Sequence, residues 1–288
     1  MSEVASLSPP DASAASPMLE GSEAICLFVF AQSDNVRKRP SEAVDERLIL
    51  RRVGSIAALI GAVPISDYCG AAGERNLADA AWIAPRVRRH AELVECTMRL
   101  SPVFPIPFGT LYKSFDSLAA FMRAHEESIG GFLQRVADKE EWELRACARF
   151  DSPEILDRLA CDAWPEWRAL TKGVRYMRAC RDRDALLDVG RAAAAARVRE
   201  FVAELRPLAA SVRQHDPGRR LDPGAGEPIA RYAFLVERSN ADEVRARVKE
   251  IAVGASRQNI GITLSGPWPP FSFRPDLSAP NQAMDGVS

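Results

Sequence analysis

Three prolines within six residues, Pro102, Pro105 and Pro107, separate two stretches of helical periodicity. Proline has no backbone N–H and restricts its own φ angle, so this segment can neither continue a helix nor form a central strand. We therefore expect residues 101–112 to be extended and to run along a sheet edge or over the surface. The elements on either side must be separate, and this limits the folds that are open to the chain.

Short apolar runs before the prolines have the composition of strands. Residues 24–31 are rich in β-branched and aromatic side chains, which predicts a central strand. Residues 48–53 and 56–63 are two further runs, and the Gly-Ser pair between them predicts a hairpin. The polar stretch 32–45, with a basic cluster at 37–39, is predicted to be a loop.

Apolar residues recur every three or four positions on both sides of the prolines, as on one face of a helix. In residues 82–100 the predicted face consists of Ile83, Val87, Ala91, Val94 and Met98. In residues 116–136 it consists of Leu118, Phe121, Met122, His125, Ile129, Phe132, Leu133 and Val136. Residues 141–150 then alternate between apolar and polar, which predicts a half-buried strand. This α+β order predicts an N-terminal ferredoxin-like sandwich over residues 24–150.

A second α+β domain with a long helix is expected over residues 151–275. A chain of 288 residues is long enough for two domains. Ser152 and Pro153 have the character of a helix cap and first turn. The segments that follow are a long helix over 175–213 with a break near Pro207, a loop over 215–228, a strand over 229–237, a helix from Ser239 or Asn240 to about residue 253, and a strand over 261–265. Residues 1–23 and 276–288 are predicted to be disordered tails.

Composition excludes several classes of protein. With 38 basic and 39 acidic residues the formal charge is −1, so a polycationic nucleic-acid binder is not expected. No window approaches the roughly 18–20 apolar residues that cross a bilayer. The six cysteines are far apart and lack zinc-site spacing, so we expect reduced, mostly buried thiols. We expect a soluble cytoplasmic protein without nucleic-acid or membrane partners.

Candidate catalytic residues are few. Only His90, His125 and His215 are present, and His125 begins a zinc-protease-like string that lacks its second histidine. The one Gly-x-Gly, at Gly224 and Gly226, lacks the third glycine of a dinucleotide-binding motif. No phosphate-binding loop or nucleophile elbow occurs. We expect no catalytic, metal or cofactor site, although acid and base residues could still be brought together from distant positions.

Two segments combine prolines with aromatic side chains, one at 102–112 and one at 266–273. Proline lowers the entropy lost on docking, and aromatic rings supply large contact areas, so both segments suit protein recognition. An alternative stays open, in which the aromatics cover a sheet and the prolines end its strands. The candidate partner-binding residues are Phe104, Phe108, Gly109, Tyr112, Trp268, Phe271 and Phe273.

Five ordered motifs resemble a known family. They lie at residues 102–112, 141–145, 172–176, 231–238 and 265–273, and the string Gly-Pro-Trp-Pro-Pro-Phe-Ser-Phe in the last is the most specific. Together they resemble the gas vesicle protein F/L family (GvpF/GvpL) over residues 24–273.

Three positions depart from the family pattern. Pro107 stands where the family usually has a basic residue, and Ser265 and Phe271 stand where it has threonine and tyrosine. The last two changes are mild. Pro107 removes both a charge and a backbone donor, so a contact that depends on that basic residue is not carried over.

The resemblance implies a non-enzymatic accessory protein of gas vesicle formation, either a minor structural component or an assembly factor. Its implied partners are the small, hydrophobic major gas vesicle shell protein and other gas vesicle accessory proteins, and its implied location is the cytoplasm and the gas vesicle. A protein that protects an apolar, self-assembling subunit needs an exposed apolar surface and no chemistry. This agrees with the lack of a recognisable catalytic set.

Two other functions remain open on the residues alone. A ferredoxin-like small-ligand-binding protein or enzyme would use a sheet face as its pocket. An RNA-binding protein would use the sheet as a stacking platform, but the neutral charge and the lack of a basic aromatic strand motif argue against it.

Overall fold

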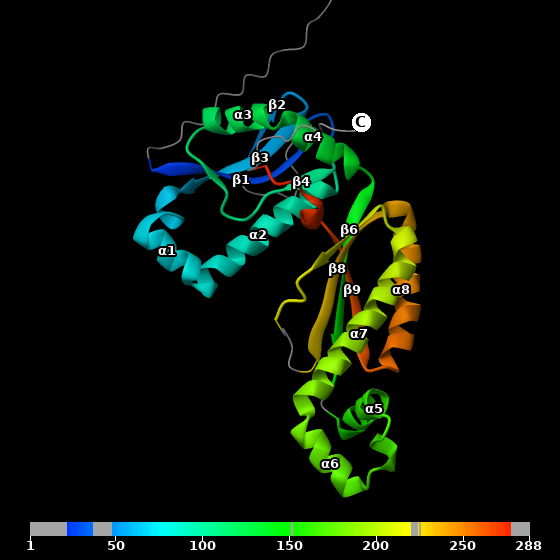
Figure 1. Cartoon of the computed structure of the whole chain (residues 1–288). Helices are drawn as coiled ribbons and strands as arrows, with labels where there is room; N and C mark the ends of the chain where they lie inside the picture. Colours follow the sequence, from blue (N-terminus) through cyan, green and yellow to red (C-terminus); the bar gives the residue numbers. More distant parts are fainter. Residues whose placement is uncertain (1–21, 37–47, 151, 220–223, 225, 278–288) are drawn as a thin grey trace, which may run out of the picture.

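The computed structural model describes residues 22–36, 48–150, 152–219, 224 and 226–277, which form two antiparallel sheets with helices (Figure 1). The chain is therefore α+β, as predicted. The basic cluster at 37–39 and nearly all of the two predicted tails lie outside the described residues. The N-terminal tail was predicted to end at residue 23, but the first strand already begins there.

The first sheet has the strand order β2-β3-β1-β4. Its strands are β1 (Glu23–Gln32), β2 (Leu48–Val53), β3 (Ile56–Pro64) and β4 (Val103–Pro105), and the short β5 (Leu111–Tyr112) also pairs with β1. The interior position of β1 and the β2-β3 hairpin are confirmed. The proline segment is extended, also as predicted, and contributes β4 at the sheet edge.

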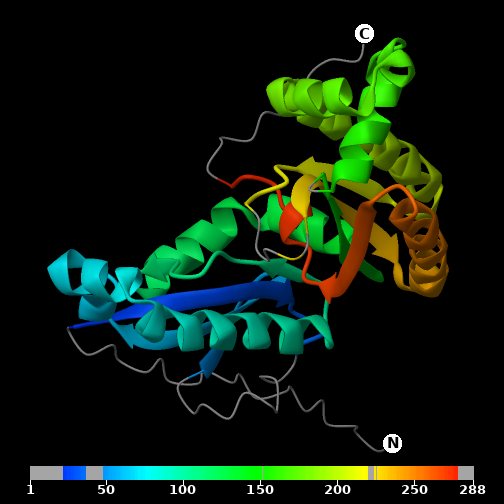
Figure 2. The same ribbon diagram turned by 90° about the horizontal axis from the view of Figure 1, so that it is seen from below.

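Helices cover both faces of the first sheet, and Figure 2 shows blue β1 between them. They are α1 (Gly70–Ala78), α2 (Ala80–Met98), α3 (Phe115–Ala124) and α4 (Glu126–Arg135). Leu93 and Val94 of α2 pack on one face, and α3 and α4 pack on the other. The sequence reading missed α1, and its single helix over 116–136 is two helices that meet at His125.

The predicted buried face of α2 is partly wrong. Val87 and Ala91 are exposed, whereas His90 and Thr97 are buried. Both buried polar groups find backbone partners: the Thr97 hydroxyl donates to the Leu93 carbonyl, and His90 Nε2 lies 2.8 Å from the Ile106 carbonyl oxygen. Such hydrogen bonds let polar side chains enter a core that apolar periodicity alone would not assign to them.

The second sheet has the order β7-β8-β6-β9, with every neighbouring pair antiparallel. Its strands are β6 (Lys139–Ala148), β7 (Ser211–His215), β8 (Glu227–Glu237) and β9 (Ile260–Trp268). The alternation of β6 was predicted, but we expected this strand to complete the first sheet. It lies instead between β8 and β9. A ferredoxin-like topology is therefore not shown for residues 24–150.

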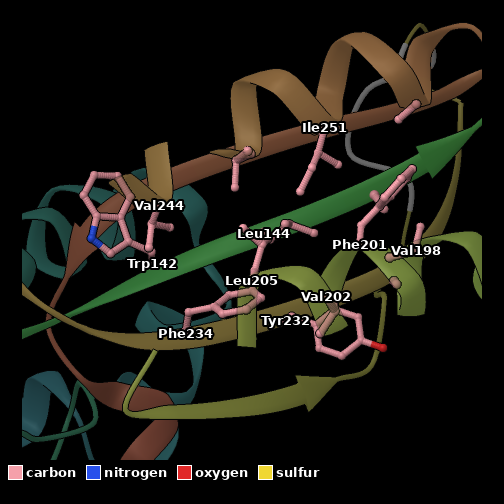
Figure 3. Close-up of a cluster of buried hydrophobic side chains, with 14 of the residues drawn as sticks. Trp142, Leu144, Val198, Phe201, Val202, Leu205, Tyr232, Phe234, Val244 and Ile251 are labelled. Atoms are coloured by element: carbon pink, nitrogen blue, oxygen red, sulfur yellow. The ribbon is translucent and has the colours of Figure 1, made fainter. Parts of the chain in front are cut away.

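Two helices cover one face of the second sheet. They are α7 (Arg183–Leu205) and α8 (Ala241–Ser256), and their apolar residues pack against Trp142, Leu144 and Phe234 (Figure 3). The predicted long helix ends at Leu205, so its break near Pro207 is confirmed. Its extension to residue 213 is wrong, because residues 211–213 belong to β7. Its start is also later than predicted, since a separate helix precedes it.

A small helical tip lies at the end of the molecule away from the first sheet (Figures 1 and 2). It contains α5 (Pro153–Ala163) and α6 (Lys172–Arg181), which pack with the start of α7 around buried Trp167. The Ser152 hydroxyl accepts a hydrogen bond from the Ile155 amide, so the predicted cap is confirmed. Short 3-10 turns occur at Ile65–Asp67, Trp167–Ala169, Arg206–Leu208, Arg238–Asn240 and Phe271–Phe273.

The two sheets share part of one core. Ala233 and Leu235 of β8, and Phe273 after β9, join the cluster that contains Phe104 and the apolar residues of α3 and α4. The outer face of the second sheet is therefore packed against the first half of the chain at one end. This junction brings distant segments together and positions the candidate site.

Candidate protein-binding site

The two proline-aromatic segments meet at the junction of the sheets. Phe104 and Phe273 belong to the same buried cluster. Arg274 links the segments directly, because its Nη1 donates to the Pro105 carbonyl at 2.9 Å while its guanidinium lies 5.8 Å from the Phe104 ring centre. Two segments that are far apart in the sequence thus form one structural unit.

A groove of about 650 Å³ runs along this junction. Its apolar wall includes Leu27, Phe104, Ile106, Tyr112 and Phe121, and its other wall consists of residues 271, 272 and 274–277. Basic side chains stand at the β7 end, where Arg213 also lies over the Phe273 ring at 5.7 Å. The groove therefore combines an apolar, largely aromatic wall with charged groups of both signs, Arg213, Arg274 and Asp276.

The seven predicted site residues fall into three groups by exposure. Phe104 and Phe273 are core residues, only 1% and 5% exposed. Phe108, Gly109 and Tyr112 are half-buried. Trp268 and Phe271 are each 43% exposed, so these two offer the largest free aromatic surface of the set. Some of these aromatics therefore build the core, and others face solvent.

Gly109 and Phe108 shape the turn that follows β4. Gly109 has φ +80°, a conformation that a side chain strongly disfavours, and no atom lies within 4 Å of the position that a Cβ would take. Phe108 packs against the rings of Tyr68 and His90, with ring centres 6.1 and 5.8 Å away. The turn is therefore fastened to α2.

His90, on α2, holds the first proline-aromatic segment, residues 102–112, in place. Its Nε2 donates to the Ile106 carbonyl at 2.8 Å, and its ring also packs against Phe28. Its Nδ1 is buried without a hydrogen-bond partner. Burial lowers the pKa of His90, and the bond to Ile106 opposes this only in part. The imidazole is thus held neutral, with its proton on Nε2.

Glu141 anchors the second aromatic segment. This carboxylate is buried on β6 and accepts hydrogen bonds from the Ser272 amide at 2.9 Å and the Ser272 hydroxyl at 2.6 Å. Burial raises the pKa of Glu141, although the Ser272 bonds oppose the shift. The sequence reading quoted both residues within its motifs but did not pair them. The one sequence feature that could have indicated this contact is the position of the charged Glu141 directly before the apolar residues of β6.

Charged side chains occupy the outer face of the second sheet near the groove. Glu143 binds Arg145 and Arg231, with Arg231 Nε 2.7 Å from its carboxylate. Burial alone would raise the pKa of Glu143, but the bonds to Arg145 and Arg231 outweigh it and the pKa is lowered. Burial, followed by the charge of Arg231, lowers the pKa of neighbouring His215.

Other expectations can be checked in the described part of the chain. There, no cluster of three His, Cys, Asp or Glu residues has the geometry of a metal site, and no helix is long and apolar enough to cross a membrane. The expectation that the thiols are mostly buried is wrong, since only Cys26 is buried, while Cys69 and Cys180 are exposed. Both exposed cysteines lie at the ends of helices.

Comparison with known proteins gives a family match over most of the chain. The model of the family described as "Gas vesicle synthesis protein GvpL/GvpF" matches residues 27–275. Gas vesicle protein L of Streptomyces sp. (strain CB03234) is 25% identical over 225 residues, which cover 78% of this chain and 82% of that protein. Gas vesicle protein L2 of Halobacterium salinarum is 33% identical over 99 residues, or 32% of this chain and 34% of that protein.

Solved structures share the fold. The crystal structure of GvpF from Anabaena sp. PCC7120 aligns with a TM-score of 0.62 at 16% identity, covering 88% of this chain and 97% of that one. GvpF from Microcystis aeruginosa aligns with a TM-score of 0.58 at 14% identity, covering 88% of this chain and 99% of that one. At these identities the likeness concerns the fold alone.

Proposed function

The chain belongs to the gas vesicle synthesis protein GvpL/GvpF family, and we propose that it is an accessory protein of gas vesicle formation that binds the major hydrophobic shell protein. It acts as an assembly factor or minor structural component and also contacts other gas vesicle accessory proteins. It works in the cytoplasm and at the gas vesicle. Binding, rather than covalent chemistry, is its task.

The observation that carries this proposal is the exposure of Phe271, which lines the groove, and of Trp268, three residues before it. Both come just before Ser272 and Arg274, which bond to Glu141 and to the Pro105 carbonyl and so hold this part of the chain in place. Exposed aromatics on a rigid support lose little entropy on binding, and they supply the large contact areas typical of binding hot spots. An apolar partner would cover side chains that are otherwise left in water.

Co-expression tests the proposal. The chain would be produced with the major shell protein, purified by an affinity tag, and the shell protein that remains in the soluble fraction would be measured. We expect a soluble complex that an unrelated ferredoxin-like control does not form. Recovery of well-folded protein without shell protein would contradict direct binding.

A small-ligand-binding role is the second candidate, and the groove volume of about 650 Å³ favours it. This volume lies within the range typical of ligand pockets, and its rim offers polar groups beside an apolar floor. A ligand that raises the melting temperature with increasing concentration would support this role. If compounds with anionic and aromatic groups left the melting temperature unchanged, this candidate would be abandoned.

For the fold, we propose that the second sheet, not the first, has the ferredoxin-like arrangement. From β6 to β9 the chain runs strand, helices, hairpin, helix and strand, and the order β7-β8-β6-β9 is consistent with that topology. On this basis the second domain begins with β6, at residue 139 instead of 151. Separate expression of residues 139–277 would test it, with a cooperative melting transition as the expected result.

A further inference from the structure

The strand β9 is an unusual sheet edge. Four strands lie at the ends of the two sheet orders: β2, β4, β7 and β9. Three of them are short, with six, three and five residues, and carry Arg51 and Arg52, Pro105, or Arg213. β9 has nine residues and contains no charged side chain. Sheet edges are normally protected by charge, proline or short length, and over most of its length β9 has none of these.

The first six residues of β9 have the geometry needed for further pairing. Residues 260–265 pair with β6 without a register shift, and irregular pairing begins only after Ser265. Pro267 lies beyond this regular part. Among the residues that the structure describes, β9 pairs with β6 alone, so one side of its backbone has no neighbouring strand. Such an edge can accept another strand through main-chain hydrogen bonds.

The apolar side chains of β9 are also less buried than those of its neighbour β6. Leu264 and Ile262 face the same core as Leu144 and Ala146, their direct partners on β6. The β6 side chains are 0% and 1% exposed, whereas Leu264 and Ile262 are only half-buried. α8 covers part of this face (Figure 3). An apolar segment placed beyond β9 would complete the cover.

We propose that β9 takes up an extended, uncharged, apolar segment of the partner protein as an additional strand. The inference rests on the proposed function, because the segment belongs to the same hydrophobic partner. An edge without charges offers nothing to a charged segment, but it suits one that buries apolar side chains against Leu264 and Ile262. Trp268 ends β9, and its Nε1 donates to the Ser265 hydroxyl at 3.2 Å. One partner segment can therefore contact the edge and the exposed aromatic together.

Charged substitutions on the edge test the proposal. Gly261→Lys and Thr263→Lys each place a cation on an exposed position of β9. Gly261 tolerates a side chain, because the nearest atom to an added Cβ is the Cys147 carbonyl oxygen at 3.9 Å. Each variant should reduce partner binding by about tenfold or more, since a charge opposes an apolar strand. Gln214→Lys, on exposed β7, is the matched control and should bind normally.

Hydrogen exchange on the full chain provides the second readout. On partner binding, the backbone amides of residues 260–265 that point away from β6 should exchange more slowly. If wild-type protein binds while these amides stay unprotected and the β9 variants bind normally, the edge proposal is wrong and the aromatic binding site remains. If wild-type protein does not bind at all, the proposed function fails and this inference fails with it. A stable dimer without partner, with residues 260–265 already protected, would assign the edge to a second copy and overturn the proposal.

Discussion

The buried carboxylate of Glu141 accepts two hydrogen bonds from Ser272, one from its amide and one from its hydroxyl, across 131 positions of sequence. This contact fastens the segment after β9 to β6. Phe273 is thereby held in the core while Phe271 stays exposed on the turn. A buried polar pair thus holds the residue next to the exposed Phe271.

Ser272→Ala should destabilise the protein by about 1–3 kcal/mol, because it leaves a buried carboxylate with one hydrogen bond fewer. Urea unfolding measures this change in the free energy of unfolding. Ser256→Ala, at an exposed position at the end of α8, is the matched control and should change the stability by less than about 0.5 kcal/mol. Equal stabilities for the two variants would show that the Glu141 contact does not stabilise the fold.

Glu141→Gln should change the pH dependence of stability. Because burial raises the pKa of Glu141 above its usual 4.5, the folded state favours the protonated carboxyl. The stability from this group is complete below pH 4.5 and is lost as the pH rises through the folded-state pKa. The glutamine variant has no such loss, so its free energy of unfolding should rise relative to wild type over that range. If the free energy of unfolding of the variant minus that of wild type stays constant or falls with increasing pH, the assignment is wrong.

His90→Gln tests a pKa shift in the opposite direction, a lowered pKa. Burial lowers the pKa of His90 below its usual 6.5, so the folded state favours the neutral ring. The stability from this group is complete above pH 6.5 and is lost as the pH falls through the folded-state pKa. Chemical unfolding at several pH values should therefore show wild type losing stability relative to the variant below pH 6.5. If the free energies of unfolding of wild type and variant change in parallel with pH, protonation of His90 does not control this loss.

Phe104→Ala and Phe271→Ala should separate stability from binding. Phe104 is fully buried, so its truncation should cost about 3–5 kcal/mol in the free energy of unfolding. Phe271 is exposed, so its truncation should cost less than about 1 kcal/mol but weaken partner binding. Thermal unfolding together with affinity purification distinguishes the two effects. Normal binding by a folded Phe271→Ala variant would remove this residue from the site.

Local patterns in the sequence were enough to predict many of the elements. The β2-β3 hairpin follows from the Gly54-Ser55 turn, and the start of α5 follows from Ser152 and Pro153. The alternation of β6 predicts the burial of its apolar residues 142, 144, 146 and 148, but not that of Glu141. Each of these features depends on residues that are neighbours in the chain. The family resemblance, which rested on five separate motifs, is also confirmed.

Long-range pairing could not be predicted in the same way. The alternation of β6 is equally compatible with either sheet, and only its pairing with β8 and β9 assigns it to the second. The burial of His90 depends on a carbonyl 16 residues away, at Ile106. The two aromatic segments were identified from composition, but their convergence depends on Arg274 reaching Pro105. No local pattern encodes these partners.

The claim that the partner binds at the exposed aromatics is tested most directly by comparing two double variants in co-purification with the shell protein. The double variant Trp268→Ala, Phe271→Ala removes the proposed contact. The double variant Tyr176→Ala, Met177→Ala is the control: these two side chains lie on the distant helical tip and are more exposed to solvent, at 72% and 73%. The account predicts that the first variant, still folded, loses the shell protein and that the second retains it. Retention by the first variant, or an equal loss by both, would contradict the claim that the partner binds at the junction of the two sheets.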